Sequence, residues 1–438
     1  MKFPKLDLPW LVLCISAITL FALGGARVTH ASNDFVPVYT GALCLLHGCD
    51  PYQPSQLEQQ FFAAGGQAKE LPSWQIDVPV YPPSTFLALS PLALLRFPVA
   101  RWVWFLLNGS LFVLSAMLVL SMCPAHRWLA TVLVSFIVAT AGILLVLGQP
   151  GMFAISTMIL GTCLLLLGRL LPLGTLMLML SLAVKPQIGG LLVLYLVIRR
   201  IHWRYAAVSL AGAGALLLCA GLILRHHPRS AGWTSTLQSN LSTTLSPGGS
   251  ADPRPQNPQA IGDINLQTLS SIFFADARKF NTAAYALFLG LMAAGVAAVL
   301  RASRLPETHL IALAALSILS LMPVYHRFYD SRLLLLSVPA AMIVFEKRRL
   351  LGASIVILTA LSAVSIQYRL QMSLLESGQW HSVVANKFLL ILLLRQQNLE
   401  LFLLYCLYLA AIFSFRSPGA AAMQANPMQR VAIPLEAG

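Results

Sequence analysis

Hydrophobic runs recur along this chain and are separated by shorter polar segments. They cover approximately residues 10–25, 101–122, 128–147, 151–167, 171–184, 187–200, 206–224, 281–300, 308–323, 332–345, 350–367 and 399–415. A helix needs about 20 apolar residues to cross the roughly 30 Å hydrocarbon core of a membrane, and most of the runs approach that length. The pattern therefore predicts an all-α polytopic membrane protein.

Two polar stretches, residues 26–83 and 225–279, are too long to be tight turns. Both are rich in residues that favour turns and irregular backbone, although residues 57–64 are predicted to form a short surface helix. After the first stretch, Ser84 to Phe97 is apolar, but it is short and interrupted by proline. Its length predicts a re-entrant or tilted piece rather than a membrane span.

The composition agrees with a membrane protein. Of the 438 residues, 58% are hydrophobic and only 10% are charged, whereas a soluble domain carries about 25% charged residues. The net charge of +14 would suggest a nucleic-acid partner in a soluble protein. Here the basic residues lie in short clusters between apolar runs, as orienting charges do, so no nucleic-acid partner is expected.

The basic clusters decide the predicted topology, because short loops rich in Lys and Arg stay in the cytoplasm. If residues 84–97 do not cross, alternation places every cluster inside and gives about 12 transmembrane helices with both termini inside. Residues 26–83 and 225–279 are then extracytoplasmic loops of one transmembrane domain, residues 1–416, and residues 417–438 form a disordered cytoplasmic tail. The clusters contain Lys2, Lys5, Arg127, Arg169, Arg199, Arg200, Arg204, Arg301, Arg304, Lys347, Arg348, Arg349 and Arg416.

The first hydrophobic run allows two interpretations. It follows a basic N-terminus, and Thr29-His30-Ala31 resembles the small-residue cleavage site of a signal peptide. The alternative is an uncleaved first span with its N-terminus in the cytoplasm.

The seven cysteines are scattered and form no CxxC or Cys/His array, so no metal site and no cofactor are predicted. Only Cys44 and Cys49 are close in sequence. In an extracytoplasmic loop they form either a disulfide or a pair of free thiols.

Polar residues at the ends of the apolar runs converge on the outer face in this topology. They are Asp34, Gln149, Lys185, His326 and Asp330. The basic clusters fix the topology without reference to these residues, so their convergence independently indicates a functional site.

Most of these residues also have a structural explanation. Asp34 either caps the following helix or acts as a general base. Lys185 is either a functional residue near membrane depth, where Pro186 breaks the helix, or a side chain that snorkels to the interface. His326, Arg327 and Asp330 either bind and orient a phosphate or belong to an interfacial belt with the neighbouring aromatic residues.

One reaction suits a carboxylate and several cations in an outward-facing cavity. A general base deprotonates an acceptor hydroxyl, while the cations stabilise a phosphate leaving group. A donor whose phosphate is attached to a lipid would reach such a site laterally, from the bilayer.

These positions resemble, in order, the motifs of the GT-C type integral-membrane glycosyltransferases, in particular glycosyltransferase family 87, which includes polyprenyl-phosphate-mannose-dependent mannosyltransferases. The resemblance covers about residues 10–345. The matching positions are Asp34 with Tyr39, then Gly48, Pro51 and Tyr52, then Tyr81-Pro82-Pro83 with Pro91-Leu92, then Gly148-Gln149, Lys185-Pro186 with the basic stretch 199–204, and His326-Arg327-Phe328-Tyr329-Asp330.

The resemblance implies inverting transfer of a sugar, a hexose such as mannose, from a polyprenyl-phosphate donor to an extracytoplasmic glycan or glycolipid. It places the enzyme in a bacterial inner membrane and implies neither a metal nor a nucleotide-sugar donor. The residue roles that it implies are Asp34 as the base, Lys185, His326 and Arg327 at the donor phosphate, and Tyr39, Tyr81, Gln149 and Asp330 in substrate binding.

This sequence departs from the family pattern at two places. Pro150-Gly151 follows Gln149 where the family often has Asn, which leaves the role of Gln149 open. Asn265-Leu266-Gln267-Thr268-Leu269-Ser270 matches the Asn/Ser motif of the later loop only loosely.

Two other functions compete with the glycosyltransferase. A secondary transporter or flippase for a lipid-linked sugar would also use broken helices and a membrane-depth lysine. Its polar residues would gather near the midplane, however, and no inverted repeat is visible. An O-antigen-ligase-like enzyme shares the lipid-phosphate donor but normally lacks the early aspartate.

Overall fold

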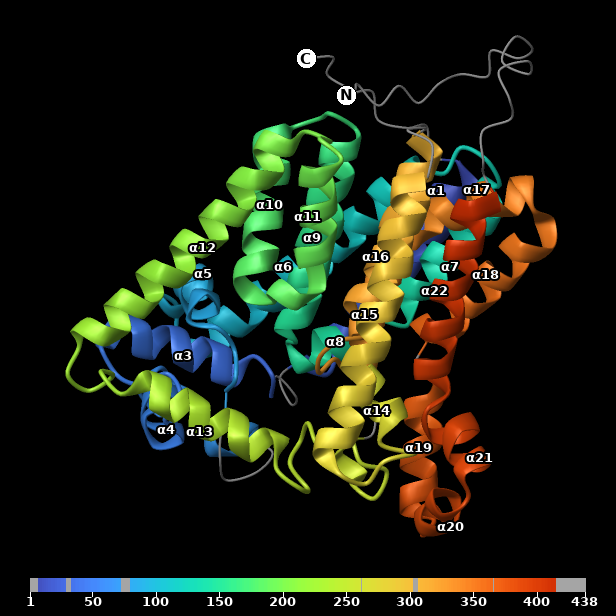
Figure 1. Ribbon diagram of the computed structural model, residues 1–438. Helices are drawn as coiled ribbons and strands as arrows, with labels where there is room; N and C mark the ends of the chain where they lie inside the picture. Colours follow the sequence, from blue (N-terminus) through green and yellow to red (C-terminus); the bar gives the residue numbers. More distant parts are fainter. Residues whose placement is uncertain are drawn as a thin grey trace.

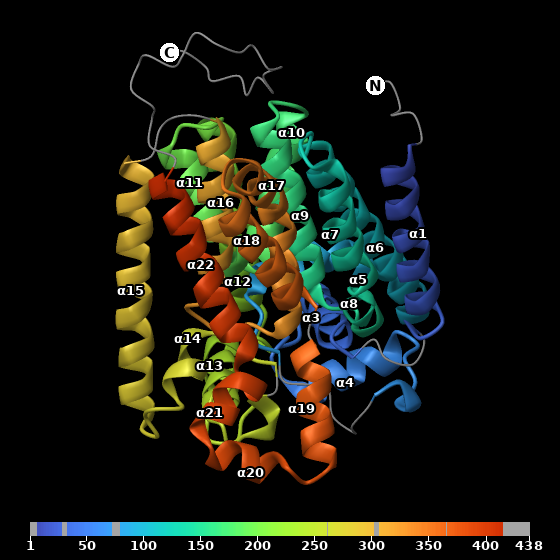
Figure 2. The same ribbon diagram turned by 90° about the vertical axis from the view of Figure 1, so that its right-hand side faces the viewer.

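The computed structural model describes residues 7–28, 33–71, 79–260, 262–301, 306–364 and 366–414. Long helices stand side by side in the upper part of the molecule, and shorter helices form a second layer at their lower ends (Figures 1 and 2). Within the described residues, β-structure is limited to one isolated bridge between Asp263 and Arg327. The protein is therefore all-helical, as the hydrophobic pattern predicts.

Seven described helical segments are long and apolar enough to cross a membrane. Two of them consist of consecutive helices, because α7 (Arg127–Ala139) continues into α8 (Gly142–Leu147), and η3 (Phe328–Ser337) continues into α17 (Val338–Lys347). The other five are α1 (Leu8–Gly25), α6 (Phe97–Ser121), α12 (Trp203–His226), α15 (Ala277–Arg301) and α22 (Gln396–Ser414).

Shorter apolar helices stand among these seven. They are α9 (Pro150–Leu166), α10 (Leu171–Val184), α11 (Pro186–Ile198), α16 (Pro306–Ser320) and α18 (Arg349–Ala363). A further apolar helix, α3 (Val36–His47), lies crosswise at the lower end of the bundle (Figure 1). The described residues thus provide twelve upright segments, and α1 begins at the same end where α22 finishes (Figure 2). The prediction of about 12 transmembrane helices is confirmed.

Two predictions concern residues that the structure does not describe. The predicted tail, residues 417–438, and the sequence resembling a cleavage site, Thr29-His30-Ala31, both lie outside the described residues. They stay predictions.

The lower layer contains both long polar stretches and the segment before α22. Several short helices interrupt these stretches, whereas the sequence predicted only one, at residues 57–64. The layer comprises α3, α4 (Pro54–Ala63), η1 (Ala68–Glu70), α5 (Pro83–Ala93), α13 (Trp233–Leu245), η2 (Pro258–Ala260), α14 (Leu266–Ser270), α19 (Ile366–Glu376), α20 (Trp380–Ala385), α21 (Lys387–Leu389) and the π-helical turn η4 (Leu390–Leu394).

Two predictions about the first polar stretch and the apolar segment that follows it are confirmed. Helix α4 occupies the stretch expected to form a short helix, with Leu57 and Phe61 buried against the rest of the layer. Helix α5 rises about 1.5 Å per residue, so its 11 residues are far too few to cross the membrane.

The lower layer contains a local disulfide and the hydrogen bonds of a buried tyrosine. Cys44 at the end of α3 is joined to Cys49, which follows the left-handed Gly48, so the disulfide alternative is the one that the structure contains. The hydroxyl of buried Tyr52 donates to the Tyr81 carbonyl at 2.8 Å, and Asn240 of α13 donates to the Tyr52 carbonyl at 2.9 Å. Because these bonds satisfy buried polar groups, they fix the backbone that leads into α5.

Candidate active site

Asp34 lies in the turn between α1 and α3, at the boundary between the bundle and the lower layer. Its backbone N–H donates to the Leu147 carbonyl at the end of α8, at 3.1 Å. Its carboxylate Oδ2 accepts a hydrogen bond from Nε2 of Gln149 at 2.8 Å. Asp34 is half-buried, so its carboxylate is oriented by the protein and still partly exposed.

Gln149 connects Asp34 to two tyrosines. Its Nε2 donates to the Tyr329 hydroxyl at 2.6 Å as well as to Asp34, and its Oε1 lies 3.4 Å from the Tyr81 hydroxyl, which donates to it. Oε1 also caps α9 by accepting from the Gly151 N–H at 3.2 Å. The departure from the family pattern leaves the role of Gln149 open, and the structure places it at the centre of the cluster.

Gly148 is required for this arrangement. It ends α8 as a left-handed C-cap with φ +67°. A Cβ there would lie 2.7 Å from the Cβ of Phe35. Only glycine combines this backbone conformation with so close an approach, and the tight turn aims Gln149 at Asp34.

A second cluster is centred on Asp330, which is fully buried. Its Oδ2 accepts from Nζ of Lys185 at 2.5 Å and from the Arg327 backbone N–H at 3.3 Å, and it lies 2.9 Å from Nδ1 of His326. Lys185 occupies the break between α10 and α11, where Pro186 starts the new helix. The lysine and histidine predicted to contact a phosphate therefore already contact a carboxylate.

Lack of space for a side chain explains why a glycine, Gly151, follows Pro150. A Cβ at this position would lie 2.9 Å from Oδ1 of Asp330 and 3.4 Å from Nζ of Lys185. The first turn of α9 thus presses against the ion pair and brings the Gln149 and Asp330 clusters together.

Gly151→Ala is expected to displace the Lys185–Asp330 pair, because the added methyl group has no room. Overpacking of this kind costs typically about 1–3 kcal/mol, which corresponds to roughly 5- to 150-fold in kcat/KM if it falls on the reaction. Steady-state kinetics and thermal unfolding of the purified variant measure the two effects. Gly190→Ala is the matched control, since a Cβ on that α11 glycine meets no atom within 4 Å. Equal kinetics for both variants would contradict the prediction.

Arg327 faces the second polar stretch. Its Nε lies 3.5 Å from Oδ1 of Asp263, it donates to the Tyr325 hydroxyl, and its Nη2 donates to the Ser250 carbonyl at 3.3 Å. Backbone bonds pair the two segments, with the Ile264 N–H on the His326 carbonyl at 2.9 Å. The second stretch therefore closes over the predicted phosphate-binding motif.

Asp263 and Tyr329 belong to the site but were not predicted from the sequence. Tyr329 belongs to a motif that the sequence did single out, but its side chain was assigned only to an aromatic belt. Asp263 stands next to the Asn/Ser-like stretch, and an acidic residue in that position was the signal that could have found it.

Tyr39 does not join the cluster. Its hydroxyl donates to the Leu95 carbonyl at 2.6 Å, and its buried ring packs against Phe35 and Phe97. Tyr39 was expected to bind substrate, but in the structure its side chain contacts the turn before α6.

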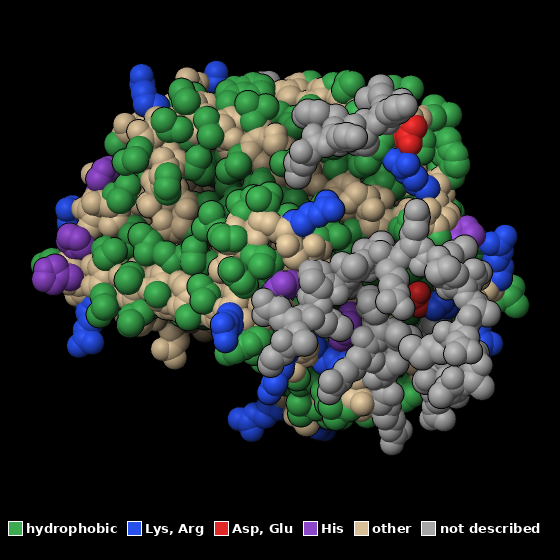
Figure 3. Space-filling view, turned by 90° about the horizontal axis from the view of Figure 1, so that it is seen from above, with side chains coloured by type: hydrophobic (Ala, Val, Ile, Leu, Met, Phe, Trp, Pro, Cys, Tyr) green, Lys and Arg blue, Asp and Glu red, His purple; other side chains and the backbone are tan. Residues whose placement is uncertain are grey.

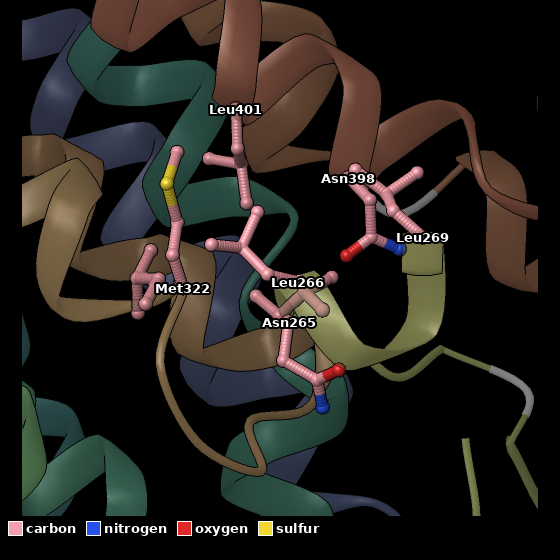
Figure 4. A pocket seen from close by; sticks show the side chains of 8 residues that line it. Asn265, Leu266, Leu269, Met322, Asn398 and Leu401 are labelled. Carbon is pink, nitrogen blue, oxygen red and sulfur yellow. The ribbon is translucent and has the colours of Figure 1, made fainter. Parts of the chain in front are cut away.

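A small recess borders the site between α14, the end of α16 and α22. In Figure 4, Leu266 lies between Met322 and Asn398. The lining is mostly apolar and includes none of Asp34, Lys185 or Asp330. This recess is therefore distinct from the cavity that the sequence predicts around Asp34.

The sequence model of glycosyltransferase family 87 matches residues 80–325, more than half of the chain. The chain belongs to glycosyltransferase family 87. Together with the membrane-spanning helices, this membership makes the protein a multi-pass membrane glycosyltransferase. The family match is shorter than the predicted 10–345. It includes Tyr81, Gln149, Lys185 and Asp263, whereas Asp34 and Asp330 lie outside it.

One solved structure is similar to this family 87 member over most of its length. It is the crystal structure of ArnT from Cupriavidus metallidurans bound to undecaprenyl phosphate. The identity is 11% and the TM-score is 0.41, with 92% of this chain and 76% of that chain covered. No curated protein matches the chain.

Proposed function

We propose that this family 87 enzyme transfers a sugar, a hexose such as mannose, from a polyprenyl-phosphate donor to a hydroxyl of an extracytoplasmic glycan or glycolipid. The observation that carries the proposal is the contact network of Asp34. Gln149 orients this half-buried carboxylate at 2.8 Å, and the first turn of α9 joins Gln149 to the Lys185–Asp330 pair.

Asp34 acts as the general base in this reaction. It takes the proton of the acceptor hydroxyl, whose oxygen attacks the anomeric carbon, and the bond between that carbon and the phosphate oxygen breaks with inversion. The electron pair of the broken bond stays on the lipid phosphate. A general base contributes typically 10²- to 10⁴-fold to such a step.

Lys185 and Arg327 stabilise the departing phosphate. An ammonium group has three N–H donors, so Lys185 can contact a phosphate oxygen while Asp330 still orients it. His326 and Asp330 then act as positioning residues, because both are fully buried and Asp330 contacts both the lysine and the histidine. Tyr81 and Tyr329, both bonded to Gln149, offer hydroxyls to the sugar.

The site lies on the extracytoplasmic face in this proposal, in the inner membrane of a bacterium. The opposite end of the bundle, where α1 begins and α22 finishes, shows more Lys and Arg than Asp and Glu (Figure 3). Cytoplasmic ends of membrane proteins carry such an excess of basic residues.

Cysteine labelling in intact cells is expected to reach position 248 from outside and positions 200 and 348 only after the membrane is made permeable. Gly248, Arg200 and Arg348 are all exposed, so a difference in labelling reports the side of the membrane. Labelling of position 248 only from the cytoplasm would place the proposed site on the wrong face.

The purified, reconstituted enzyme tests the donor. It is incubated with a synthetic polyprenyl-phosphate hexose, with the corresponding nucleotide sugar, and with glycolipid acceptors from the bacterial envelope. We expect release of polyprenyl phosphate and formation of a glycoside of inverted configuration with the lipid donor alone. Transfer from the nucleotide sugar, or movement of the lipid-linked sugar across the vesicle membrane without transfer, would refute the proposal.

A further inference from the structure

A buried carboxylate in the second polar stretch, Asp263, has no role in the reaction described above. Its side chain is fully buried, and none of the described residues makes a hydrogen bond to either of its carboxylate oxygens. Buried carboxylates are nearly always hydrogen-bonded, because an unsatisfied charge away from water is costly. Asp263 therefore calls for a functional explanation.

The partner of Asp263 is the arginine that the proposed function assigns to the donor phosphate. Nε of Arg327 lies 3.5 Å from Oδ1 of Asp263, at ion-pair distance but without a hydrogen bond. Their backbones are held together by the antiparallel bridge between the two residues, and the Phe328 N–H donates to the Gly262 carbonyl. The backbones thus hold the two residues next to each other, while the side chains form an ion pair without a hydrogen bond between them.

Four charged or titratable groups influence Asp263. Arg327 and Tyr325 come from the segment before η3, Arg395 from the residue before α22, and Asp252 from the same polar stretch. Arg395 binds the Ala260 and Pro253 carbonyls rather than the carboxylate. Burial, only partly offset by the two arginines, raises the pKa of Asp263 to about 7.

We propose that Asp263 is a positioning residue that holds Arg327 while the donor is absent and takes up a proton when a lipid phosphate engages Arg327. This inference rests on the proposed function of the Arg327 site. A phosphate next to the guanidinium brings a second anion close to a carboxylate that has no hydrogen bonds to lose. Like charges at short range in a water-poor site disfavour the ionised form, so the carboxylate becomes neutral and Arg327 pairs with the phosphate.

The proposal predicts that donor binding is linked to proton uptake. The exchange operates above about pH 7, where Asp263 is mostly ionised in the free enzyme. Below this value the carboxyl is mostly protonated before the donor binds, so affinity depends little on pH. As the pH rises above this value, binding must supply a proton to Asp263, and affinity falls by up to about tenfold per pH unit. The enzyme would therefore hold its lipid phosphate more tightly on the acidic side of neutrality.

The test measures binding of a polyprenyl methyl phosphate diester to the full-length reconstituted protein between about pH 6 and pH 9, a range that brackets the raised pKa. This diester keeps a single negative charge over the whole range, so the probe itself does not titrate. We expect the wild type to lose affinity in the upper part of the range and Asp263→Asn to bind with a flat profile. Asp276→Asn is the matched control, an exposed aspartate of the same stretch, and it should keep the wild-type profile.

A second measurement needs no variant and covers the case in which Asp263→Asn does not fold. A pH indicator should report uptake of up to about one proton per bound diester near the alkaline end of the range and almost none near its acidic end. Binding with no pH dependence and no proton uptake would overturn the role of Asp263, and so would a pH-dependent profile retained by Asp263→Asn. A wild type that fails to bind the diester at any pH would instead refute the proposed lipid-phosphate site.

Discussion

Asp34→Asn is expected to lower the rate of sugar transfer by about 10²- to 10⁴-fold, the typical contribution of a general base. The amide has nearly the shape of the carboxylate but cannot accept the proton of the acceptor hydroxyl. Single-turnover transfer from a polyprenyl-phosphate hexose measures the loss. Affinity for the donor should change little, because the proposed phosphate contacts come from other residues.

The geometry around Asp34 makes this variant informative. The amide that replaces the carboxylate would still offer an oxygen to Nε2 of Gln149, which bonds Asp34 at 2.8 Å, and the backbone bond to Leu147 is unaffected. A loss of rate with unchanged thermal unfolding would therefore report chemistry and not misfolding. Turnover close to that of the exposed control Asp276→Asn would show that Asp34 is structural and remove the base from the proposal.

Lys185→Ala is expected to lower kcat/KM. The activation free energy should rise by about 2–4 kcal/mol, the range observed when one group that stabilises a transition-state anion is removed. Negative charge gathers on the phosphate oxygen as the glycosidic bond breaks, so the ammonium group should matter more in the transition state than in the bound donor. The expected result is a larger loss in kcat than in donor affinity, measured by steady-state kinetics together with equilibrium binding.

Lys185→Ala also breaks the ion pair with Asp330, so the effect on stability must be separated from the effect on transfer. Removing Lys185 leaves a fully buried carboxylate with His326 and a backbone N–H as its remaining described partners, and breaking a buried pair is destabilising in itself. The double variant Lys185→Ala/Asp330→Asn removes both charges. If it regains stability but not transfer, the lysine acts on the donor. If it regains transfer as well, Lys185 serves only to neutralise Asp330, and the donor phosphate is bound elsewhere.

The sequence predicted at which end of the bundle the polar residues of the site lie, but not which of them bond to one another. Asp34, Lys185 and Asp330 were predicted to meet at one end of the bundle, and the structure brings them together through Gln149 and the first turn of α9. Counting the membrane helices is enough for this result, because each hydrophobic run reverses the side of the membrane on which the next polar residue lies. This count does not show which polar groups bond to each other, so the pairing of Asp330 with Lys185 was not predicted.

The helical content of the polar stretches was also beyond the sequence pattern. Residues 26–83 and 225–279 are rich in turn-forming residues, yet several short helices lie within them. Local propensity is a weak prior that tertiary contacts override. Here contacts such as Tyr52 with Tyr81, and Asn240 with Tyr52, stabilise the short helices around them, of which only α4 was predicted from the sequence.

The sequence by itself determined the all-α membrane architecture, the approximate number of spans, the non-crossing piece at α5 and the end of the bundle where the polar residues gather. These properties depend on hydrophobicity and charge summed over neighbouring residues, which any contiguous stretch reveals. Only the tertiary structure decided that Gln149 orients Asp34 and that Asp330 pairs with Lys185, because these bonds join residues 115 and 145 positions apart. It also decided that Asp263 faces Arg327. Contacts of this range follow from how the helices pack, and packing depends on side-chain shape at many positions at once.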